Sequence, residues 1–225
     1  MISRYFGISL PLDLTFDEGK LKHDLEVAEQ FEFATHPLKY HDGSWTAINL
    51  IYAGGKNHYS HEGDLGYGVG EPIATEVLEA CRYFKEVIAQ FPGTIKMARL
   101  SALPPGGRIA RHYDPVESAD FDQLRIHIPI RSNPKQVVFH LGFKRQWWYP
   151  GRAWYGDFTL PHSVHNKADY TRVSMIIDLD LTDSAKRLFP DTYFSEKERK
   201  RREWFRAQTR SISWRLDQIS KVRAA

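Results

Sequence analysis

Two histidines, one aspartate and one arginine have the types and spacing of a metal-dependent oxidation site. His112 and Asp114 form a His-x-Asp triplet, and His162 follows fifty residues later in a Leu-Pro-His-Ser-Val segment. Two imidazoles and one carboxylate leave three of the six positions of an octahedral ferrous ion open, as a non-haem oxygenase needs for a co-substrate and O₂. Arg172, ten residues beyond His162, offers a forked cation that suits the far carboxylate of a dicarboxylic co-substrate.

The His-x-Asp triplet alone does not indicate a metal site, because ten His and fifteen Asp in 225 residues give about 0.7 such triplets by chance. The residues around the triplet provide the further evidence. A Pro-Pro-Gly-Gly turn at 104–107 precedes a short predicted strand at 108–112, and Asp114-Pro115 then begins a loop. Functional residues often lie where a strand meets a loop. A surface histidine beside a turn-forming Asp-Pro pair is the alternative interpretation.

The second histidine ligand has two candidates. His162 follows Pro161, whose fixed backbone presents the next side chain from a turn, and His165 lies in the same segment. Three residues apart in an extended chain, the two point to opposite faces, so only one of them can be the ligand. A hydrogen-bonded loop histidine is the alternative for either.

Two strands carry charged residues among apolar ones. Arg172 opens an apolar, β-branched run, where a buried cation requires a counter-anion, either a bound carboxylate or an internal Asp or Glu. In 124–130 the apolar residues alternate with Arg125 and His127. If the apolar side forms the core between sheets, this polar pair faces solvent; if the strand lines a barrel mouth, the pair faces a ligand.

Composition is that of one folded domain with a basic appendage. Hydrophobic residues make up 42% of the chain and charged residues 26%, and the single Cys81 excludes an internal disulfide and a cysteine-based cluster. The chain contains no apolar stretch of membrane-spanning length and no signal peptide, so we expect a cytoplasmic protein without a membrane partner.

The C-terminal tail is strongly basic. Residues 183–225 hold twelve Lys/Arg and six Asp/Glu, a net charge of +6, which leaves a net charge of −3 for the remainder of the chain. Such a tail is either a solvated charged helix or a surface for an anionic partner.

The pattern of apolar residues predicts helices first, strands next and a helix last. Helices are expected at 17–31, with Thr15 and Glu18 as a capping box, and at 73–90, with a strand at 45–53 between them. A loop at 54–70 carries His58, Tyr59, His61 and Tyr67. Short strands, typical of a sandwich or barrel, are expected at 96–103, 108–112, 124–131, 136–141, 153–158 and 172–181. The pattern of the tail predicts a helix from Ser195. We expect one face of this helix to dock on the body or on a second subunit, and that face carries Phe205, Ile212, Leu216 and Ile219.

In its ordered motifs the chain resembles the aspartyl/asparaginyl β-hydroxylase family of iron- and 2-oxoglutarate-dependent oxygenases, to which bacterial free-proline hydroxylases belong. The close motifs span about residues 98–181, and the tail after Asp183 has no counterpart. The resemblance implies a mainly β fold with flanking helices and a double-stranded β-helix (jelly-roll, cupin-like) core. We therefore predict an oxygenase domain at 1–182, with a cover at 1–94 and a jelly-roll core at 95–182, and a basic helical extension at 183–225. The residues that carry the resemblance are His112-x-Asp114, Arg125-x-His127, Gly151, Asp157, Pro161-His162-Ser163-Val164 and Arg172.

The resemblance also implies the roles of individual residues. His112, Asp114 and His162 are expected to bind Fe(II), with His162 chosen over His165 by its ten-residue step to Arg172. Arg172 is expected to pair with the C5 carboxylate of 2-oxoglutarate. Three further positions match ones near the co-substrate: His127, Ser101 and Arg125, the last of which can hold a co-substrate or a substrate carboxylate. The retained Asp114 favours hydroxylation over halogenation.

The expected activity is therefore a hydroxylation that uses Fe(II), 2-oxoglutarate and O₂, with ascorbate as a candidate reductant, and releases succinate and CO₂. We expect a small anionic substrate such as an amino acid or a derivative, and a homodimer through the C-terminal helix is a further expectation. One alternative is oxidation of a nucleotide, a nucleic acid or a peptide, and among these we favour nucleic acid least. The other alternative is a non-catalytic jelly-roll binding module. A stretch of aromatic residues either walls the substrate pocket or packs within the β-sheets: Trp147, Trp148, Tyr149, Trp154 and Tyr155. Anchors for an anionic substrate are expected among Arg108, Arg111, Arg125, Arg131 and Arg152.

Overall fold

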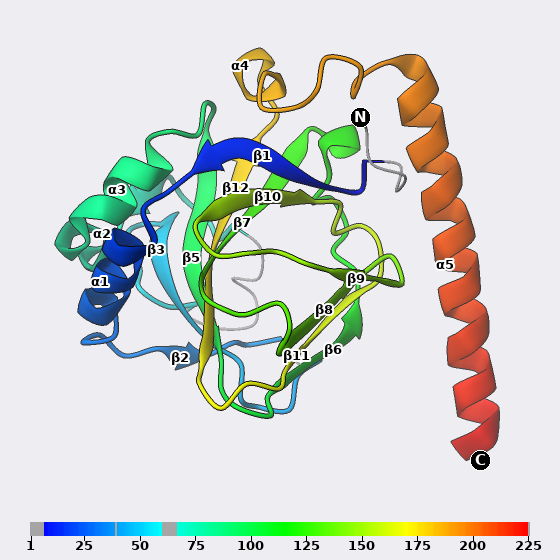
Figure 1. Ribbon diagram of the computed structural model, residues 1–225, viewed down its shortest axis with the longest axis horizontal. Coiled ribbons are helices and arrows are strands. Elements are labelled where there is room, and N and C mark those ends of the chain that lie inside the picture. The colour runs from blue at the N-terminus through cyan, green and yellow to red at the C-terminus, as the bar shows by residue number, and fades with distance from the viewer. Residues whose placement is uncertain (1–6, 39, 60–66, 225) are drawn as a thin grey trace.

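Two antiparallel sheets form the body of the protein (Figure 1). The computed structural model describes residues 7–38, 40–59 and 67–224, with side chains up to residue 213. The larger sheet has the order β1-β10-β7-β12-β5-β3-β2, with β4 paired to β3, and the smaller sheet the order β6-β11-β8-β9. The strands of the larger sheet are β1 (Ser9–Thr15), β2 (Ala34–Thr35), β3 (Thr46–Ala53), β4 (Pro72–Ala74), β5 (Ile95–Leu103), β7 (Gln123–Arg131), β10 (Arg152–Gly156) and β12 (Arg172–Asp180). Those of the smaller sheet are β6 (Arg108–His112), β8 (Val137–Leu141), β9 (Lys144–Gln146) and β11 (His162–Asn166).

The chain winds between the sheets as a jelly roll. From β5 to β12 it passes alternately through the larger and the smaller sheet, with β8 and β9 together forming one visit to the smaller one. Every pairing is antiparallel, and β12 lies between β5 and β7 at the centre of the larger sheet. The expected mainly β fold with a double-stranded β-helix core is thus confirmed.

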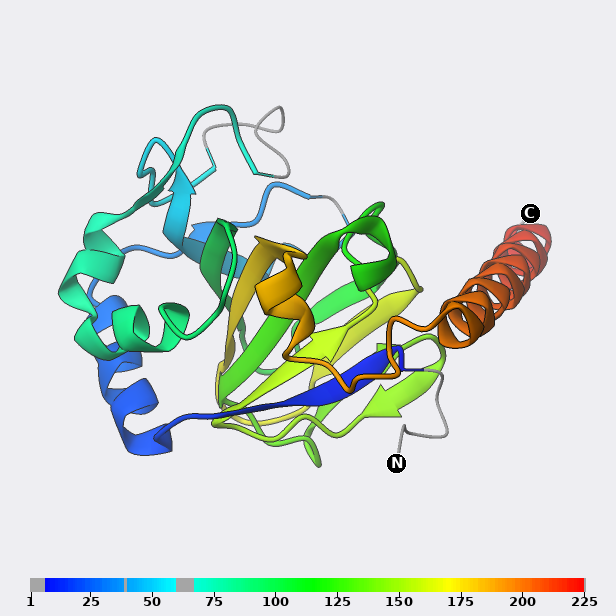
Figure 2. The same ribbon diagram turned by 90° about the horizontal axis from the view of Figure 1, so that it is seen from above.

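Three helices cover the outer face of the larger sheet, on the side away from the smaller one (Figure 2). They are α1 (Glu18–Ala28), α2 (Glu76–Ala80) and α3 (Arg82–Ile88). The main hydrophobic core lies between these helices and the sheet, where Leu124, Ile126 and Ile128 of β7 are fully buried. Because side chains alternate along a strand, Arg125 and His127 point the other way, into the space between the two sheets. Of the two interpretations of this strand, the polar pair facing an interior site is the correct one.

The helices differ from the expected ones in two places. The side chain of Asp17, rather than that of Thr15, caps α1 by accepting a hydrogen bond from the Lys20 N–H at 2.9 Å. The single helix expected at 73–90 is instead β4, α2 and α3. The helix breaks at Cys81, whose φ of −102° and ψ of 87° are not helical, and the buried Asp24 carboxylate of α1 accepts the Phe84 N–H at 2.9 Å in the first turn of α3.

Five strands were not predicted from the sequence: β1, β2, β4, β9 and β11. The segment of β11, which we expected to be a turn after Pro161, pairs with both β6 and β8. β1 pairs with β10 across more than 130 residues of chain. A short 3₁₀ helix (Ala119–Phe121) lies between β6 and β7. These pairings depend on contacts far apart in the sequence, which a local pattern does not record.

The tail forms α4 (Asp183–Lys186) and the long helix α5 (Glu196–Ala224). The Glu198 N–H donates to the Ser195 hydroxyl at 3.4 Å, as the predicted cap requires. Phe205 packs against the hydrophobic cluster of the smaller sheet, but Ile212 is 48% exposed, and the side chains of Leu216 and Ile219 lie outside the described residues. Over the described part of the chain, no helix is both long and apolar enough to cross a membrane.

Candidate metal centre

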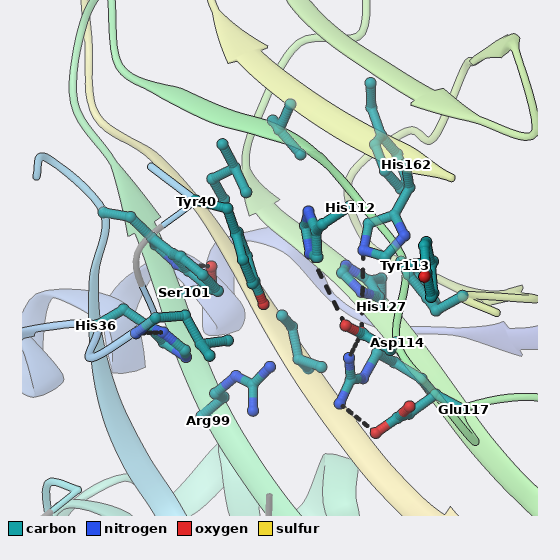
Figure 3. Close-up of a pocket in the computed structure, with 18 of the residues that line it drawn as sticks. His36, Tyr40, Arg99, Ser101, His112, Tyr113, Asp114, Glu117, His127 and His162 are labelled. Carbon is teal, nitrogen blue, oxygen red and sulfur yellow. Dashed lines mark hydrogen bonds and ion pairs between the residues drawn. The ribbon is translucent and has the colours of Figure 1, made fainter. Parts of the chain in front are cut away.

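His112, Asp114 and His162 meet at one end of the smaller sheet (Figure 3). The antiparallel pairing of β6 with β11 places His162 opposite His112, and Asp114 begins the loop two residues after His112. One potential ligand atom from each residue lies within 4.8 Å of the other two. The Asp114 carboxylate is 3.8 Å from Nε2 of His112 and 3.9 Å from Nε2 of His162. The structure therefore brings together the three predicted ligands in the two-histidine, one-carboxylate arrangement that suits a ferrous ion.

Backbone carbonyls fix the orientation of both imidazoles. Nδ1 of His112 donates to the carbonyl of Ala110 at 2.8 Å, and Nδ1 of His162 donates to that of Leu160 at 3.0 Å. A carbonyl can only accept, so in each neutral ring the lone pair is on Nε2, the atom that faces Asp114. Such hydrogen bonds are the usual means of orienting metal-binding histidines.

Charge in the site is set by burial and by Arg125. Burial lowers the pKa of His162 to about 4 and also lowers the pKa of His112, so both rings are neutral at neutral pH, as metal binding requires. Burial alone would raise the pKa of Asp114, but the Arg125 guanidinium and the two imidazoles outweigh it and hold that pKa below its ordinary value. The donor set is thus two neutral nitrogens and one ionised carboxylate.

His165, the competing candidate, does not line the site. It pairs with Arg108 at the far end of β6, while His162 pairs with His112. Its side chain is partly exposed, and it is absent from the residues that surround the cavity described below.

A cavity of about 360 Å³ opens beside the three predicted ligands, between the two sheets. Strands of the larger sheet contribute its polar wall, and the smaller sheet and the segment between β2 and β3 contribute most of its aromatic and apolar wall. Its described lining residues are His36, Leu38, Tyr40, Trp45, Tyr59, Met97, Arg99, Ser101, Ile109, His112, Tyr113, Asp114, Pro115, Glu117, Arg125, His127, Phe139, Phe158, His162, Val164, Arg172 and Ile176.

Arg172 is a buried cation without an internal partner. It is 5% exposed, it lines the cavity, and its guanidinium has no hydrogen bond or ion pair with any residue that the structure describes. Burial lowers its pKa to about 10, which still leaves it positive at neutral pH. A desolvated, uncompensated charge is costly, so the site fits a ligand that brings an anion to Arg172.

Ser101 and His127 add polar groups near this arginine. Trp45 donates its indole N–H to the Ser101 hydroxyl at 2.9 Å, so the serine accepts there and its own proton has no acceptor among the described residues. Both ring nitrogens of His127 are buried without a partner in the described chain. Burial first, and then Arg172, lower the pKa of His127 well below its ordinary value, so the ring is neutral. Ser101 and His127 thus lie in the cavity that contains Arg172, as expected for residues near the co-substrate, and their roles stay predictions.

Arg125 already faces three carboxylates of the chain itself. It donates from Nε and Nη2 to the two oxygens of Asp178, at 2.7 and 2.8 Å. Nη1 pairs with Asp114, and Nη2 lies 3.4 Å from Glu117. The expectation that Arg125 holds a ligand carboxylate stays a prediction, and in the structure this residue instead orients the carboxylate of Asp114.

Arg99 is a cavity residue that was not predicted from the sequence. It is buried on β5, two residues before Ser101, and Figure 3 shows it pointing into the cavity. Nη1 donates to the Tyr59 hydroxyl at 3.0 Å, while Nε has no partner among the described residues. Strand alternation, which places residues 99 and 101 on the same face, was the signal that could have found it.

The other expected anchors and the aromatic wall lie elsewhere. Arg108 and Arg111 are exposed, Arg131 pairs with Glu29, and Arg152 donates to the carbonyl of Leu12. None of the aromatic residues proposed for a wall is among the described lining of the cavity. The packing interpretation is correct for Trp148, Trp154 and Tyr155, which are buried or partly buried in the hydrophobic clusters, whereas Trp147 and Tyr149 are exposed. Of the loop 54–70, Tyr59 contributes to the cavity, Tyr67 donates to Gln123 at 2.9 Å, and His61 lies outside the described residues.

Comparison with known proteins finds one matching family. The profile described as Aspartyl/Asparaginyl beta-hydroxylase matches residues 18–181. An L-proline cis-4-hydroxylase of Rhizobium meliloti (strain 1021) is 25% identical over 192 residues, which cover 81% of this chain and 62% of that protein. The match thus spans less than two thirds of the length of this curated relative. The family match runs from the first residue of α1 to just after β12, and leaves α4 and α5 outside it.

Solved structures give weaker matches. HygX from Streptomyces hygroscopicus, with nickel and 2-oxoglutarate bound, aligns with a TM-score of 0.49 at 8% identity, over 78% of this chain and 82% of that one. A prolyl-4-hydroxylase from Pseudomonas putida aligns with a TM-score of 0.46 at 10% identity, over 78% of this chain and 93% of that one.

Proposed function

Because the chain belongs to the aspartyl/asparaginyl β-hydroxylase family, we propose that it is an Fe(II)- and 2-oxoglutarate-dependent hydroxylase of a small carboxylate-bearing molecule, such as an amino acid or a derivative. The observation that carries the proposal is the unpaired, buried Arg172 in the same cavity as the His112, Asp114 and His162 cluster. In this proposal the cluster holds the iron, while Arg172 and the free proton of Ser101 hold the C5 carboxylate of 2-oxoglutarate. The bound iron and keto-acid supply the oxidising chemistry that inserts one oxygen of O₂ into a C–H bond and releases succinate and CO₂.

The chain's own residues position these groups and keep water out. The two carbonyl-bound imidazoles present Nε2, and Arg125 keeps the Asp114 carboxylate ionised and oriented. Neutral His127 can donate or accept one hydrogen bond at the cavity wall without adding charge. Phe139 and Phe158 form the apolar wall beside it and limit the access of water to the cavity.

Arg99 supports the proposed substrate class. In this proposal Arg125 pairs with internal carboxylates and Arg172 binds the co-substrate. Among the described lining residues, Arg99 is then the cation that remains to bind a substrate carboxylate. The cavity volume of about 360 Å³ is at the lower end of the range for small-molecule sites, and it must hold the co-substrate as well. Both features favour a compact, anionic substrate.

The test is a screen of amino acids and their derivatives with the purified protein, Fe(II), 2-oxoglutarate and O₂. Mass spectrometry reads succinate formation and a substrate mass gain of one oxygen. We expect one or more members of the library to stimulate succinate formation, and the His162→Ala variant to abolish it. A protein that binds Fe(II) but forms no succinate with or without any library member contradicts the proposal and favours a binding module.

The Arg99→Gln variant tests the substrate class. We expect the KM for the substrate to rise by roughly 10- to 150-fold, which corresponds to the loss of about 1.5–3 kcal/mol from a hydrogen bond to a charged group. The KM for 2-oxoglutarate should stay unchanged. Arg108→Gln, an exposed arginine on β6, is the matched control and should alter neither value. An increase confined to the KM for 2-oxoglutarate would instead assign Arg99 to the co-substrate.

A further inference from the structure

The long C-terminal helix α5 lies outside the residues that match the family, yet buried arginines anchor it to the body. Figures 1 and 2 show α5 on the side of the molecule opposite α1–α3. Arg202 and Arg206 are both buried, although they lie on a helix whose other described arginines and lysines are mostly exposed. Arg202 donates to both oxygens of Asp120, at 2.8 and 2.6 Å, and to the carbonyl of Tyr193 at 2.8 Å.

Arg206 reaches a second carboxylate that Arg202 does not contact. Its Nη1 lies 2.8 Å from the carboxylate of Asp157 and 2.7 Å from that of Asp120. One turn further along α5, Nη2 of Arg210 donates to the carbonyl of Thr159 at 3.3 Å. Two successive turns of α5 therefore hold the same short segment, Asp157 to Leu160, which connects β10 to β11.

Asp157 organises that segment from the inside. Its side chain is fully buried, and its Oδ1 accepts from the Thr159 hydroxyl at 2.6 Å and from the Thr159 N–H at 3.2 Å. The Leu160 N–H donates to the Asp157 carbonyl at 3.3 Å and closes the turn. The arginine on one carboxylate oxygen and the threonine on the other fix the conformation of this turn.

The same turn holds two of the three predicted metal ligands. The Asp114 N–H donates to the carbonyl of Phe158 at 2.9 Å, and Nδ1 of His162 donates to the carbonyl of Leu160 at 3.0 Å. Phe158 lies between Asp157 and Thr159, the two residues that α5 contacts, and Leu160 follows Thr159. A displacement of the turn would therefore move the backbone of Asp114 and rotate the ring of His162.

We propose that α5 is a brace of the metal centre, and that Arg206, supported by Arg210, is a positioning residue which acts through the Asp157–Leu160 turn. The inference rests on the proposed function, since it takes His112, Asp114 and His162 as the metal ligands. It assigns a role in metal binding to a helix that is outside the family match. Partners that orient metal ligands from the second layer typically affect metal affinity by 10- to 100-fold.

The experiment titrates the full-length apoprotein with Co(II) and follows the visible absorption of the bound ion, so that it needs neither substrate nor turnover. We expect Arg206→Gln to raise the Kd for Co(II) by roughly 10- to 100-fold and to change the absorption envelope. Arg206→Lys should keep a Kd near that of the wild type, because both carboxylates are contacted by Nη1 alone and one ammonium can replace it. Arg202→Gln is the matched control: it loosens the same helix at Asp120 without touching the turn, and should lower thermal stability while leaving the Kd unchanged.

The outcomes separate the brace from the metal centre itself. A wild-type protein that binds no Co(II), or one whose Kd is unaffected by His162→Ala, overturns the proposed function and the brace with it. A wild-type protein that binds Co(II), together with an Arg206→Gln variant of equal Kd, overturns the brace alone. An equal rise of Kd in Arg202→Gln also overturns it, because the effect would then come from helix docking in general. If Arg206→Gln does not fold, Arg210→Met decides. It removes the contact to the Thr159 carbonyl and also the packing of the Arg210 guanidinium over the Tyr113 ring, and Tyr113→Leu removes the second contact alone. A Kd that rises in Arg210→Met but not in Tyr113→Leu supports the brace, and any other result rejects it.

Discussion

At the scale of residues, unpaired polar atoms gather in one cavity. Folded proteins satisfy most buried polar groups, so exceptions require an explanation. Of the eight unpaired buried side-chain atoms found among the described residues, four belong to cavity residues: Nε of Arg99, Nε of Arg172 and both ring nitrogens of His127. Their common location indicates that the chain leaves these groups for a polar ligand.

The Arg172→Met variant tests whether Arg172 serves the binding of 2-oxoglutarate rather than the stability of the protein. Methionine has a similar length, and it removes a buried charge that has no partner in the described chain. We therefore expect the free energy of unfolding of the apoprotein to rise by about 1 kcal/mol or more, while affinity for 2-oxoglutarate falls by at least tenfold. Urea denaturation and calorimetric titration of the metal-loaded protein measure the two quantities. A variant that is less stable than the wild type would show that Arg172 has an internal role.

At the scale of elements, pairing of β6, β11 and β12 sets the site. The β6–β11 register brings His162 to His112, and the connection from β11 to β12 places Arg172 beside Leu103 of β5. Asn166 stabilises that connection through three hydrogen bonds. It is fully buried, its side-chain amide donates to the carbonyls of Leu103 and Tyr170, and its side-chain oxygen accepts from the Ala168 N–H. The ten-residue step from His162 to Arg172 therefore has a structural cause.

Asn166→Ala tests this connection. The substitution leaves two carbonyls and one N–H without their partners, so we expect the free energy of unfolding to fall by about 2–4 kcal/mol. Asn133→Ala is the matched control, because the Asn133 side chain accepts one hydrogen bond, from the Lys135 N–H, in a partly exposed turn and should cost roughly 0.5–1 kcal/mol. Chemical denaturation measures both, and equal losses would contradict the assigned role of Asn166.

At the scale of the whole molecule, the described lining of the cavity includes four histidines whose pKa values are lowered mainly by burial. The pKa falls to about 2 for His36 and about 4 for His162, and it falls also for His112 and His127. In the unfolded chain these rings titrate near 6.5, so below that pH the unfolded state binds more protons than the folded one. Their contribution to stability is fully present above pH 6.5 and is lost as the pH falls toward the folded-state values.

We therefore expect the apoprotein to lose stability between pH 6.5 and 5, by up to about 1.4 kcal/mol per pH unit for each of these histidines. Carboxylates with lowered pKa values, such as Asp114 and Asp120, lose their contribution only at lower pH and do not affect this window. Urea denaturation at several pH values measures the slope. His36→Phe, which keeps an aromatic ring against Trp45, should reduce the slope; a stability that is flat over this range would contradict the assignment.

The sequence by itself predicted the candidate ligands, their order along the chain and most of the β-strands from 95 to 181. The strands could be predicted because strand alternation is a local property, and the candidate ligands could be predicted because their ordered motifs resemble those of a known family. Only the tertiary structure showed that Arg125 pairs with Asp178 and Asp114, that Arg99 lines the cavity, and that Arg206 of α5 reaches Asp157. Each of these depends on which strands and helices become neighbours, and a buried charge takes its role from the partner that folding places beside it.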